Sequence, residues 1–399
     1  MTLLLTAAGC WNRKEPESLA LVVGMGFNYD RQSKEYEAVV NIAKPAAIEG
    51  GGGDGRSSGG GQEDGSFVTS AKGKNIFEAL RKIEPVVSRE LFWGHSEEVI
   101  ISEDLARRGI QPVLDFYSRE RESRLSNFML ATDNELKDLL QVKLPLEKVA
   151  GVGIRRQIQT VQITQSVIPF ADVRMVLIDL NRPGREIFVP RIRLKKEQSG
   201  QGGQTSSGGA SPEGGGGQPE ESIEIAGGAA FRGDRFAGWV DPVSTQGWLY
   251  ITGRPSRATE ILPCPNFKCD QHVAVEIHRV FRRLEVAIED GKPQVKVVVS
   301  VEGRLQQKDC PDQFTKQYVD KLHSLLAERV RQKAEKAVNR AKQLRSDIFG
   351  FGNAVYRKYP REWDKLKDDW EEHFTRLEVE IEVKAHIRRP GMVVDPAGP

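Results

Sequence analysis

The last strand-like segment of the chain constrains the fold most, because its apolar and polar residues alternate without a break. Charged or imidazole side chains occupy every second position from residue 376 to residue 386. Apolar side chains occupy the positions next to them, namely Leu377, Val379, Ile381, Val383, Ala385 and Ile387. Successive side chains of a strand point to opposite faces, so this segment must bury one face and expose the other. We therefore expect it in an antiparallel sheet that is covered on one side.

A long amphipathic helix is the segment best suited to cover that sheet. Between residues 314 and 348 apolar side chains recur at intervals close to the helical period. The stripe consists of Tyr318, Leu322, Leu325, Val330, Ala334, Val338, Ala341, Leu344 and Ile348. Two strand-like segments, 279–290 and 294–305, precede the helix and are joined by the hairpin signal Asp-Gly-Lys-Pro. After the helix, Trp363 and Trp370 lie seven residues apart, and we expect both on the same core.

The first half of the chain alternates strand and helix signals, which predicts a mixed α/β domain over residues 11–195. Residues 19–30 form a nearly continuous apolar run, as in a buried strand. Asn75 and Ser102 are placed to cap helices, and Gly109 is placed to end one. Together with the C-terminal pattern, these signals predict a multi-domain α+β protein with mixed or antiparallel sheets and packed helices.

Two Gly-rich segments divide the chain. Residues 49–66 and 197–221 are rich in Gly, Ser and Gln and nearly free of apolar side chains, so both are predicted to be flexible. The first lies between two strand-like stretches and indicates an insertion within a domain. The second indicates a linker, followed by a small middle domain at 222–262 and a C-terminal α+β domain at 263–392.

Balanced charge and missing motifs exclude several classes of function. Lys and Arg number 58 against 56 Asp and Glu, which gives no basic excess for binding nucleic acid. The glycine pairs at 24–30, 151–156 and 350–355 lack the third glycine of a dinucleotide fingerprint, and no P-loop is present. The six histidines form no metalloprotease spacing, and no Gly-x-Ser-x-Gly elbow occurs. We therefore expect no catalytic residue, no metal and no cofactor.

Three cysteines in the C-terminal half allow two kinds of local site. Cys264 and Cys269 have Cys-x4-Cys spacing, which favours a disulfide between them in an oxidising compartment and leaves Cys310 free. The alternative is a zinc site in which His272 and Cys310 complete the ligand set, although that spacing is not a usual one for zinc.

The N-terminal stretch ends in a cysteine that follows small residues. Leu3, Leu4 and Leu5 are apolar, and Ala7, Ala8 and Gly9 precede Cys10. One interpretation is an ordinary start that leads into the first strand. The other is the remnant of a secretory signal, residues 1–10, whose true start lies upstream. In the second case Cys10 resembles the lipobox cysteine of bacterial lipoproteins, whose thiol is acylated. After residue 10 no apolar run approaches the roughly 18 to 20 residues that cross a bilayer.

Longer stretches resemble one known family, the Ger(x)C-type spore germination lipoproteins. The C-terminal stretch at 345–393 looks like the signature of that family. Its matching residues are Asp347, Phe349, Gly350, Phe351, Gly352, Tyr359, Pro360, Trp363, Trp370, Phe374, Ile387 and Arg388. The stretches at 9–30 and 97–124 resemble the same family, whereas the Gly-rich segments are not part of its pattern.

The resemblance implies a function that composition alone does not reveal. It implies three mixed α+β domains and no known enzymatic activity. It also implies a C subunit of a nutrient germinant receptor, anchored through acylated Cys10 to membrane lipid on the outer face of the spore inner membrane. The implied partners are the integral membrane A and B type receptor subunits. The alternative from another class is a solute-binding lipoprotein of a transport system, which would have two similar lobes joined by a hinge.

Overall fold

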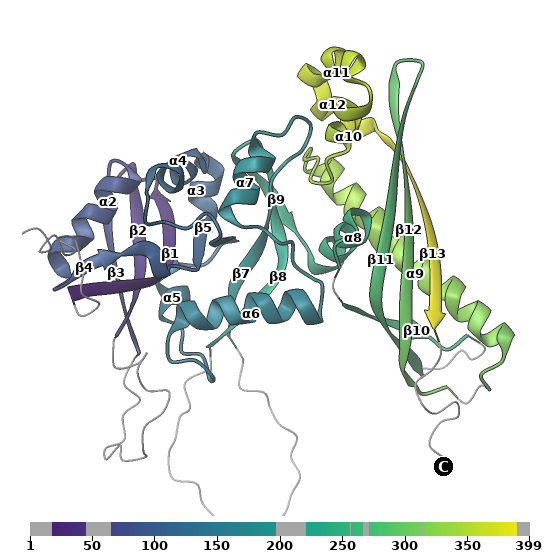
Figure 1. Ribbon diagram of the computed structural model, residues 1–399, viewed down its shortest axis with the longest axis horizontal. Helices are drawn as coiled ribbons and strands as arrows, with labels where there is room; N and C mark the ends of the chain where they lie inside the picture. The colour runs from purple at the N-terminus through teal and green to yellow at the C-terminus, as the bar shows by residue number, and fades with distance from the viewer. Residues whose placement is uncertain are drawn as a thin grey trace, which may run out of the picture.

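The computed structural model describes residues 18–44, 65–196, 221–255, 257–265, 271–310 and 313–388. Two β-sheets lie side by side along the long axis of the molecule, with helix α8 (Pro242–Thr252) between them (Figure 1). Cys10, Cys269 and most of both Gly-rich segments lie outside the described residues. The predicted α+β class, with several sheets and packed helices, is confirmed.

The first sheet contains nine strands in the order β3-β2-β1-β5-β6-β7-β8-β9, with β4 paired to β1. Strands β1, β5, β6 and β7 are parallel neighbours, and antiparallel strands extend the sheet at both ends. The strands are β1 (Leu19–Asp30), β2 (Glu35–Ala43), β3 (Ser66–Gly73), β4 (Glu90–Phe92), β5 (Glu98–Ser102), β6 (Phe128–Thr132), β7 (Phe188–Lys196), β8 (Glu221–Arg232) and β9 (Arg235–Val240).

Helices cover both faces of this sheet, as expected where parallel strands are buried on two sides. One face is covered by α2 (Ile76–Ile83), α3 (Glu103–Arg108), α4 (Gln111–Arg119) and α7 (Val173–Leu180). The other face is covered by α5 (Leu136–Gln141) and α6 (Ala150–Thr164). The predicted caps are confirmed: Asn75 Oδ1 accepts from Glu78 N at 2.8 Å, and Ser102 Oγ accepts from Leu105 N at 3.1 Å.

The prediction that residues 197–221 link two separate domains is wrong. Strand β7 ends at Lys196, β8 begins at Glu221, and these two residues are paired in an antiparallel ladder. The segment between them therefore connects neighbouring strands of one sheet. The predicted middle domain, 222–262, is likewise divided: β8 and β9 complete the large sheet, whereas β10 (Ala258–Pro263) belongs to the second sheet.

The second sheet has the order β10-β11-β12-β13, with β11 (His272–Glu289), β12 (Lys292–Lys308) and β13 (Glu378–Arg388). The predicted hairpin joins β11 to β12, and its Asp290 and Gly291 have φ of 50° and 73°, as a type I′ turn requires. The expected antiparallel pairing of the last strand is wrong, because β13 is parallel to β12. The helices that connect β12 to β13 return the chain to the end of the sheet at which β12 begins. Strand β13 therefore runs in the same direction as β12.

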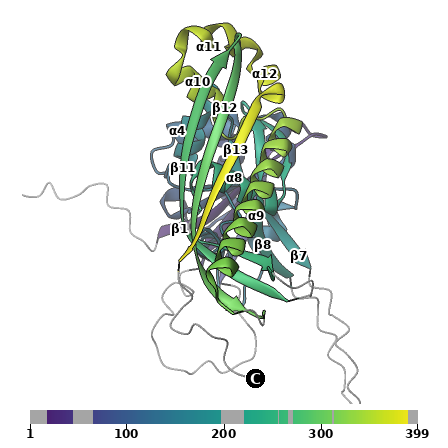
Figure 2. The same ribbon diagram turned by 90° about the vertical axis from the view of Figure 1, so that its right-hand side faces the viewer.

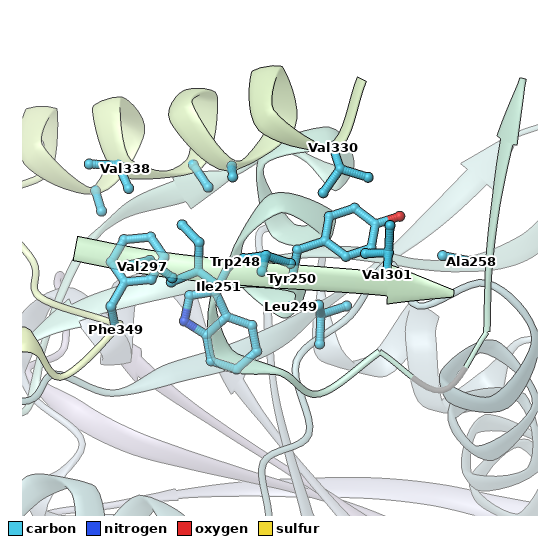
Figure 3. Packing of buried hydrophobic residues seen from close by; sticks show 14 of the residues in the cluster. Trp248, Leu249, Tyr250, Ile251, Ala258, Val297, Val301, Val330, Val338 and Phe349 are labelled. Carbon is cyan, nitrogen blue, oxygen red and sulfur yellow. The ribbon is translucent and has the colours of Figure 1, made fainter. Parts of the chain in front are cut away.

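Helix α9 (Lys316–Gln343) covers one face of this second sheet, as predicted (Figure 2). Its buried stripe departs from the predicted one at several positions. Leu326 and Ala337 are buried although they were not predicted, whereas Leu325 is only half-buried. Leu344 and the inward side chains Val379, Ile381 and Val383 are also half-buried rather than fully enclosed. Figure 3 shows side chains of α8, α9 and β12 meeting in the shared core.

Three short helices, α10 (Phe351–Lys358), α11 (Pro360–Leu366) and α12 (Trp370–Arg376), cap one end of α9 and the long strands (Figure 1). Trp363 lies in α11 and Trp370 begins α12. Both are buried in the core of the second sheet with ring centroids 5.2 Å apart, which confirms their predicted packing.

A fully buried carboxyl group lies inside the first sheet. Glu98 in β5 has no exposed surface, and neither carboxyl oxygen has a hydrogen-bond partner. The side chain passes between Gly24 of β1 and Gly151 of α6, where a Cβ would lie 2.5 and 2.9 Å from Glu98 Oε1. Burial raises the pKa of the Glu98 carboxyl well above its ordinary value, and neighbouring Glu97 raises it further.

The burial pattern predicts that Leu326 contributes more to stability than its neighbour Leu325. Leu326→Ala should lower the free energy of unfolding by about 2–5 kcal/mol, because it opens a cavity in the core. Leu325→Ala removes the same atoms from a half-buried site and should cost less than about 2 kcal/mol. Denaturant unfolding of both variants measures the difference, and equal losses would contradict the assigned helix face.

The buried Glu98 carboxyl predicts how the free energy of unfolding changes with pH. Folded Glu98 keeps a proton that the unfolded chain releases above its ordinary carboxyl pKa of 4.5. The free energy of unfolding should therefore fall as the pH rises from about 5 to 7, by up to about 1.4 kcal/mol per pH unit. Glu98→Gln cannot ionise and should show a correspondingly shallower slope. Glu289→Gln, at an exposed carboxyl, is the control, and an unchanged slope in Glu98→Gln would refute the assignment.

Candidate functional site

The structure brings together a pair of cysteines that differs from the predicted pair. Cys264 forms a disulfide with Cys310, 46 residues further along the chain, with a Cα–Cα distance of 5.9 Å. A sulfur can form only one such bond, so the predicted Cys264–Cys269 disulfide is wrong. The reason is strand register: Pro263 pairs with His272, and Val273 pairs with Lys308, so the ends of β10 and β12 meet at the start of β11.

Histidines and carboxylates do not converge on a metal site in the part of the chain that the structure describes. Within those residues no group of three or more potential metal ligands lies close together. His323 of α9 and His386 of β13 face each other with ring centroids 5.2 Å apart, a pair that no sequence signal indicated. Cys10, the predicted lipidation site, lies outside the described residues.

Asp347 is the centre of a buried polar arrangement in which every carboxyl oxygen is hydrogen-bonded. It lies just beyond the end of α9, its residue is 2% exposed, and both carboxyl oxygens accept two hydrogen bonds. Oδ1 accepts from Gly350 N at 2.9 Å and from Phe351 N at 3.1 Å. Oδ2 accepts from Gly352 N at 2.8 Å and from Trp370 Nε1 at 3.1 Å. Burial raises the pKa of the Asp347 carboxyl, and the four N–H donors offset part of that rise.

The loop between α7 and β7, residues 181–187, docks onto this arrangement from the N-terminal half. Glu186 N donates to Asp347 O at 3.0 Å, and Asn353 N donates to Gly184 O at 2.8 Å. Gly184 has φ of 65° and lies so close to Gly352 that any side chain would overlap its backbone. We call this contact between 181–187 and 347–353 the Asp347 junction.

Glycine is required where the junction meets the tryptophans. A Cβ on Gly352 would lie 2.5 Å from Trp370 Nε1 and 2.8 Å from Gly184 Cα. The rings of Phe349 and Phe351 stack beside it with centroids 5.0 Å apart. The motif residues Asp347, Phe349, Gly350, Phe351, Gly352 and Trp370 therefore form one contiguous packing unit.

Glu186 gives the junction a group that titrates near neutral pH. Its Oε2 accepts from Gly233 N at 2.6 Å. Burial raises the pKa of Glu186 to about 7; the Gly233 hydrogen bond opposes the rise, and the nearby carboxylates Asp347 and Glu371 add to it. The junction therefore gains negative charge as the pH rises through neutrality.

A second candidate feature is a polar crevice of about 270 Å³ at the carboxyl ends of β1, β5 and β6. Its lining includes Asn28, Glu37, Ser102, Thr132 and Asn134. Strand β5 leads into α3 on one face of the sheet and β6 leads into α5 on the other, the position at which α/β sheets form ligand crevices. The lining offers carboxylates, amides and hydroxyls, which can bind a small polar molecule.

Sequence reasoning identified only half of the Asp347 junction. Asp347 and its neighbours entered through the family resemblance, whereas Gly184 and Glu186 were not singled out. The sequence Asn-Arg-Pro-Gly at 181–184 is a turn signal that could have marked the loop. Nothing local to either segment indicates that the two meet.

Two family models match the chain on either side of the second Gly-rich segment. The model described as "Spore germination protein N-terminal domain" matches residues 12–194. The model described as "Spore germination B3/ GerAC like, C-terminal" matches residues 226–391. Together they cover both sheets and both sides of the Asp347 junction.

Relatives that align over nearly their whole length are also named as spore germination proteins. Spore germination protein KC of Bacillus subtilis (strain 168) is 24% identical, and the alignment covers 98% of this chain and 95% of the relative. Spore germination protein B3 of the same organism is 20% identical over 98% of this chain and 96% of the relative. The crystal structure of the GerBC protein has the same fold, with a TM-score of 0.55 at 15% identity over 92% of this chain and 97% of that chain. The chain therefore belongs to the GerAC-like, or Ger(x)C, family of spore germination proteins, as its sequence motifs predict.

Proposed function

We propose that this chain is the lipid-anchored, non-enzymatic C subunit of a nutrient germinant receptor and acts in spore germination. In this proposal it lies on the outer face of the spore inner membrane, attached through acylated Cys10. Its partners are integral membrane subunits of the A and B types. The observation that carries the proposal is the match to both family models along nearly the whole chain.

Several features of the described chain support this function. None of the described helices is long and apolar enough to span a bilayer. A pair of acyl chains on Cys10 would supply the stable membrane attachment that a single chain does not. The Asp347 junction joins the two family-model regions through a buried carboxylate. A buried contact of this kind suits a subunit that transmits a change from one region to the other.

The alternative, a solute-binding lipoprotein of a transport system, predicts two similar lobes joined by a hinge. The two sheets here differ in strand number, in pairing and in the helices that cover them. No observation favours the alternative.

Loss of the anchor cysteine tests the proposed attachment. In a chain expressed behind a complete signal peptide, Cys10→Ala should abolish labelling by a fatty acid and move the protein out of the spore membrane fraction. Cys310 is disulfide-bonded, so the matched control is Cys269→Ala, which should leave labelling unchanged. Affinity purification from spore inner membranes should recover A and B type subunits with the unaltered chain. Recovery of a transporter instead would favour the alternative.

The Asp347 junction predicts that a change at Asp347 lowers the stability of the protein. Asp347→Asn replaces one acceptor oxygen by a donor that faces two N–H groups, so the free energy of unfolding should fall by about 2–4 kcal/mol. Asp364→Asn changes an exposed carboxylate, whose side chain is 69% accessible, and should cost under about 0.5 kcal/mol. Denaturant unfolding measures both variants. If they lose the same stability, the junction does not hold the two regions together as described.

A further inference from the structure

A pocket of about 340 Å³ lies between the two regions that the family models match. The first region contributes Gln162 of α6, Met175 of α7 and residues of the loop that joins these helices. The second region contributes Leu249 of α8 and Arg254, which follows that helix. In Figure 1, α6 runs from α5 toward the second sheet, and α8 lies between the two sheets. This pocket is therefore separate from the polar crevice at the ends of β1, β5 and β6.

Hydrogen bonds hold the loop after α6, which forms one wall of the pocket, against the second region. Gly227 N of β8 donates to Val167 O at 3.0 Å. Arg257 N, in the segment after α8, donates to Ser166 Oγ at 3.1 Å. The two walls are thus joined directly beside the pocket, and a molecule bound in it would touch both regions.

Most of the lining is apolar. Ile168 and Leu249 are buried, and Phe170 and Met175 add further carbon surface. The Phe170 ring packs edge-on against Phe128 with centroids 5.7 Å apart, which fixes its orientation. Apolar pockets with a few well-placed polar groups are the ordinary form of small-molecule sites, and they occur preferentially between domains. A ligand here would therefore meet aliphatic and aromatic carbon along most of its length.

Two polar groups of the lining have no partner of the kind they ordinarily require. Gln162 Nε2 is buried, and none of the described groups accepts a hydrogen bond from it. A buried donor without an acceptor is destabilising, so it calls for an acceptor that is not part of the chain. Arg254 forms no ion pair within the described ranges. Its guanidinium carbon lies 5.9 Å from the centroid of the Trp248 ring, and its N donates to Leu249 O at 3.0 Å.

The charge of the lining distinguishes between ligands. Among the described residues that line the pocket, Arg254 carries a positive charge and no carboxylate is present. A ligand carboxylate can accept hydrogen bonds from both a guanidinium and an amide N–H group. An ammonium group would find no carboxylate and would be repelled by Arg254. The polar groups therefore favour an anionic head group, and the remaining lining favours an apolar body.

We propose that this pocket binds a small monocarboxylate with an apolar body, whose carboxylate accepts hydrogen bonds from Arg254 and Gln162. The apolar body packs between Ile168 and Phe170 of the first region and Leu249 of the second. Because the ligand contacts both regions at once, its binding strengthens their association. This inference does not depend on the proposed function.

Three probes that share one apolar body and differ only in the head group test the proposal: phenylpropanoate, phenylpropanol and phenylpropylamine. Each is titrated into the purified full chain at low ionic strength, and binding is followed by NMR of the probe. We expect saturable binding of phenylpropanoate, weaker binding of phenylpropanol and the weakest binding of phenylpropylamine. Arg254→Gln should weaken phenylpropanoate by about tenfold, as expected for a lost charge-assisted hydrogen bond, and change phenylpropanol by less than about twofold. The matched control is Arg257→Gln, which removes the same charge from a nearby residue outside the lining and should change the affinity less than about twofold.

Thermal unfolding separates a ligand-binding role of Gln162 from a structural one. Gln162→Leu replaces an unpaired buried donor by an apolar side chain of similar size, so it should not lower the melting temperature of the free protein. It should weaken phenylpropanoate and reduce the rise in melting temperature that this probe causes. A lower melting temperature of free Gln162→Leu would overturn the role assigned to Gln162.

Three results would overturn the proposal as a whole. The first is no saturable binding of phenylpropanoate up to about 10 mM. The second is equal affinity for phenylpropanoate and phenylpropylamine, and the third is equal losses in Arg254→Gln and Arg257→Gln. If Arg254→Gln does not fold, Gln162→Leu and the series of head groups decide the outcome.

Discussion

The rest of the structure depends on one buried carboxylate, that of Asp347. Four N–H groups converge on its two oxygens, and they come from the start of α10 and from a tryptophan in α12. This arrangement fixes the conformation of the turn after α9. That turn forms the surface on which the α7–β7 loop docks. Because a buried acceptor must keep its donors, the loop, the helix ends and the tryptophan pack correctly only together.

Helix α8 extends the same connection through the middle of the molecule. Eight consecutive residues of it, Ser244 to Ile251, are buried, so it contacts neighbours on every side. Tyr250 donates to Glu260 at 2.7 Å, and Lys333 of α9 donates to both oxygens of that carboxylate at 2.7 and 2.6 Å. A satisfied ion pair in the core thus ties α8, β10 and α9 in one register, which apolar packing alone would specify less uniquely.

The boundary between the two family-model matches does not coincide with a boundary between the two sheets. Their matches end at residue 194 and resume at residue 226, yet β7 and β8 pair directly across that gap. The Asp347 junction also joins residues from both matched regions. A change in the charge of Glu186, whose pKa lies near 7, would therefore act on both regions at once.

The sequence by itself determined the elements and the family of this protein, because both are written in local patterns. Alternation in 377–387 marked a half-exposed strand, Asn75 and Ser102 marked helix starts, and the 345–393 motifs marked the family. Only the tertiary structure decided that β13 runs parallel, that Cys264 bonds to Cys310, and that Gly184 packs on Gly352. Each of these depends on which distant segments share one core, and alternation, spacing and propensity report only the neighbours of a residue along the chain.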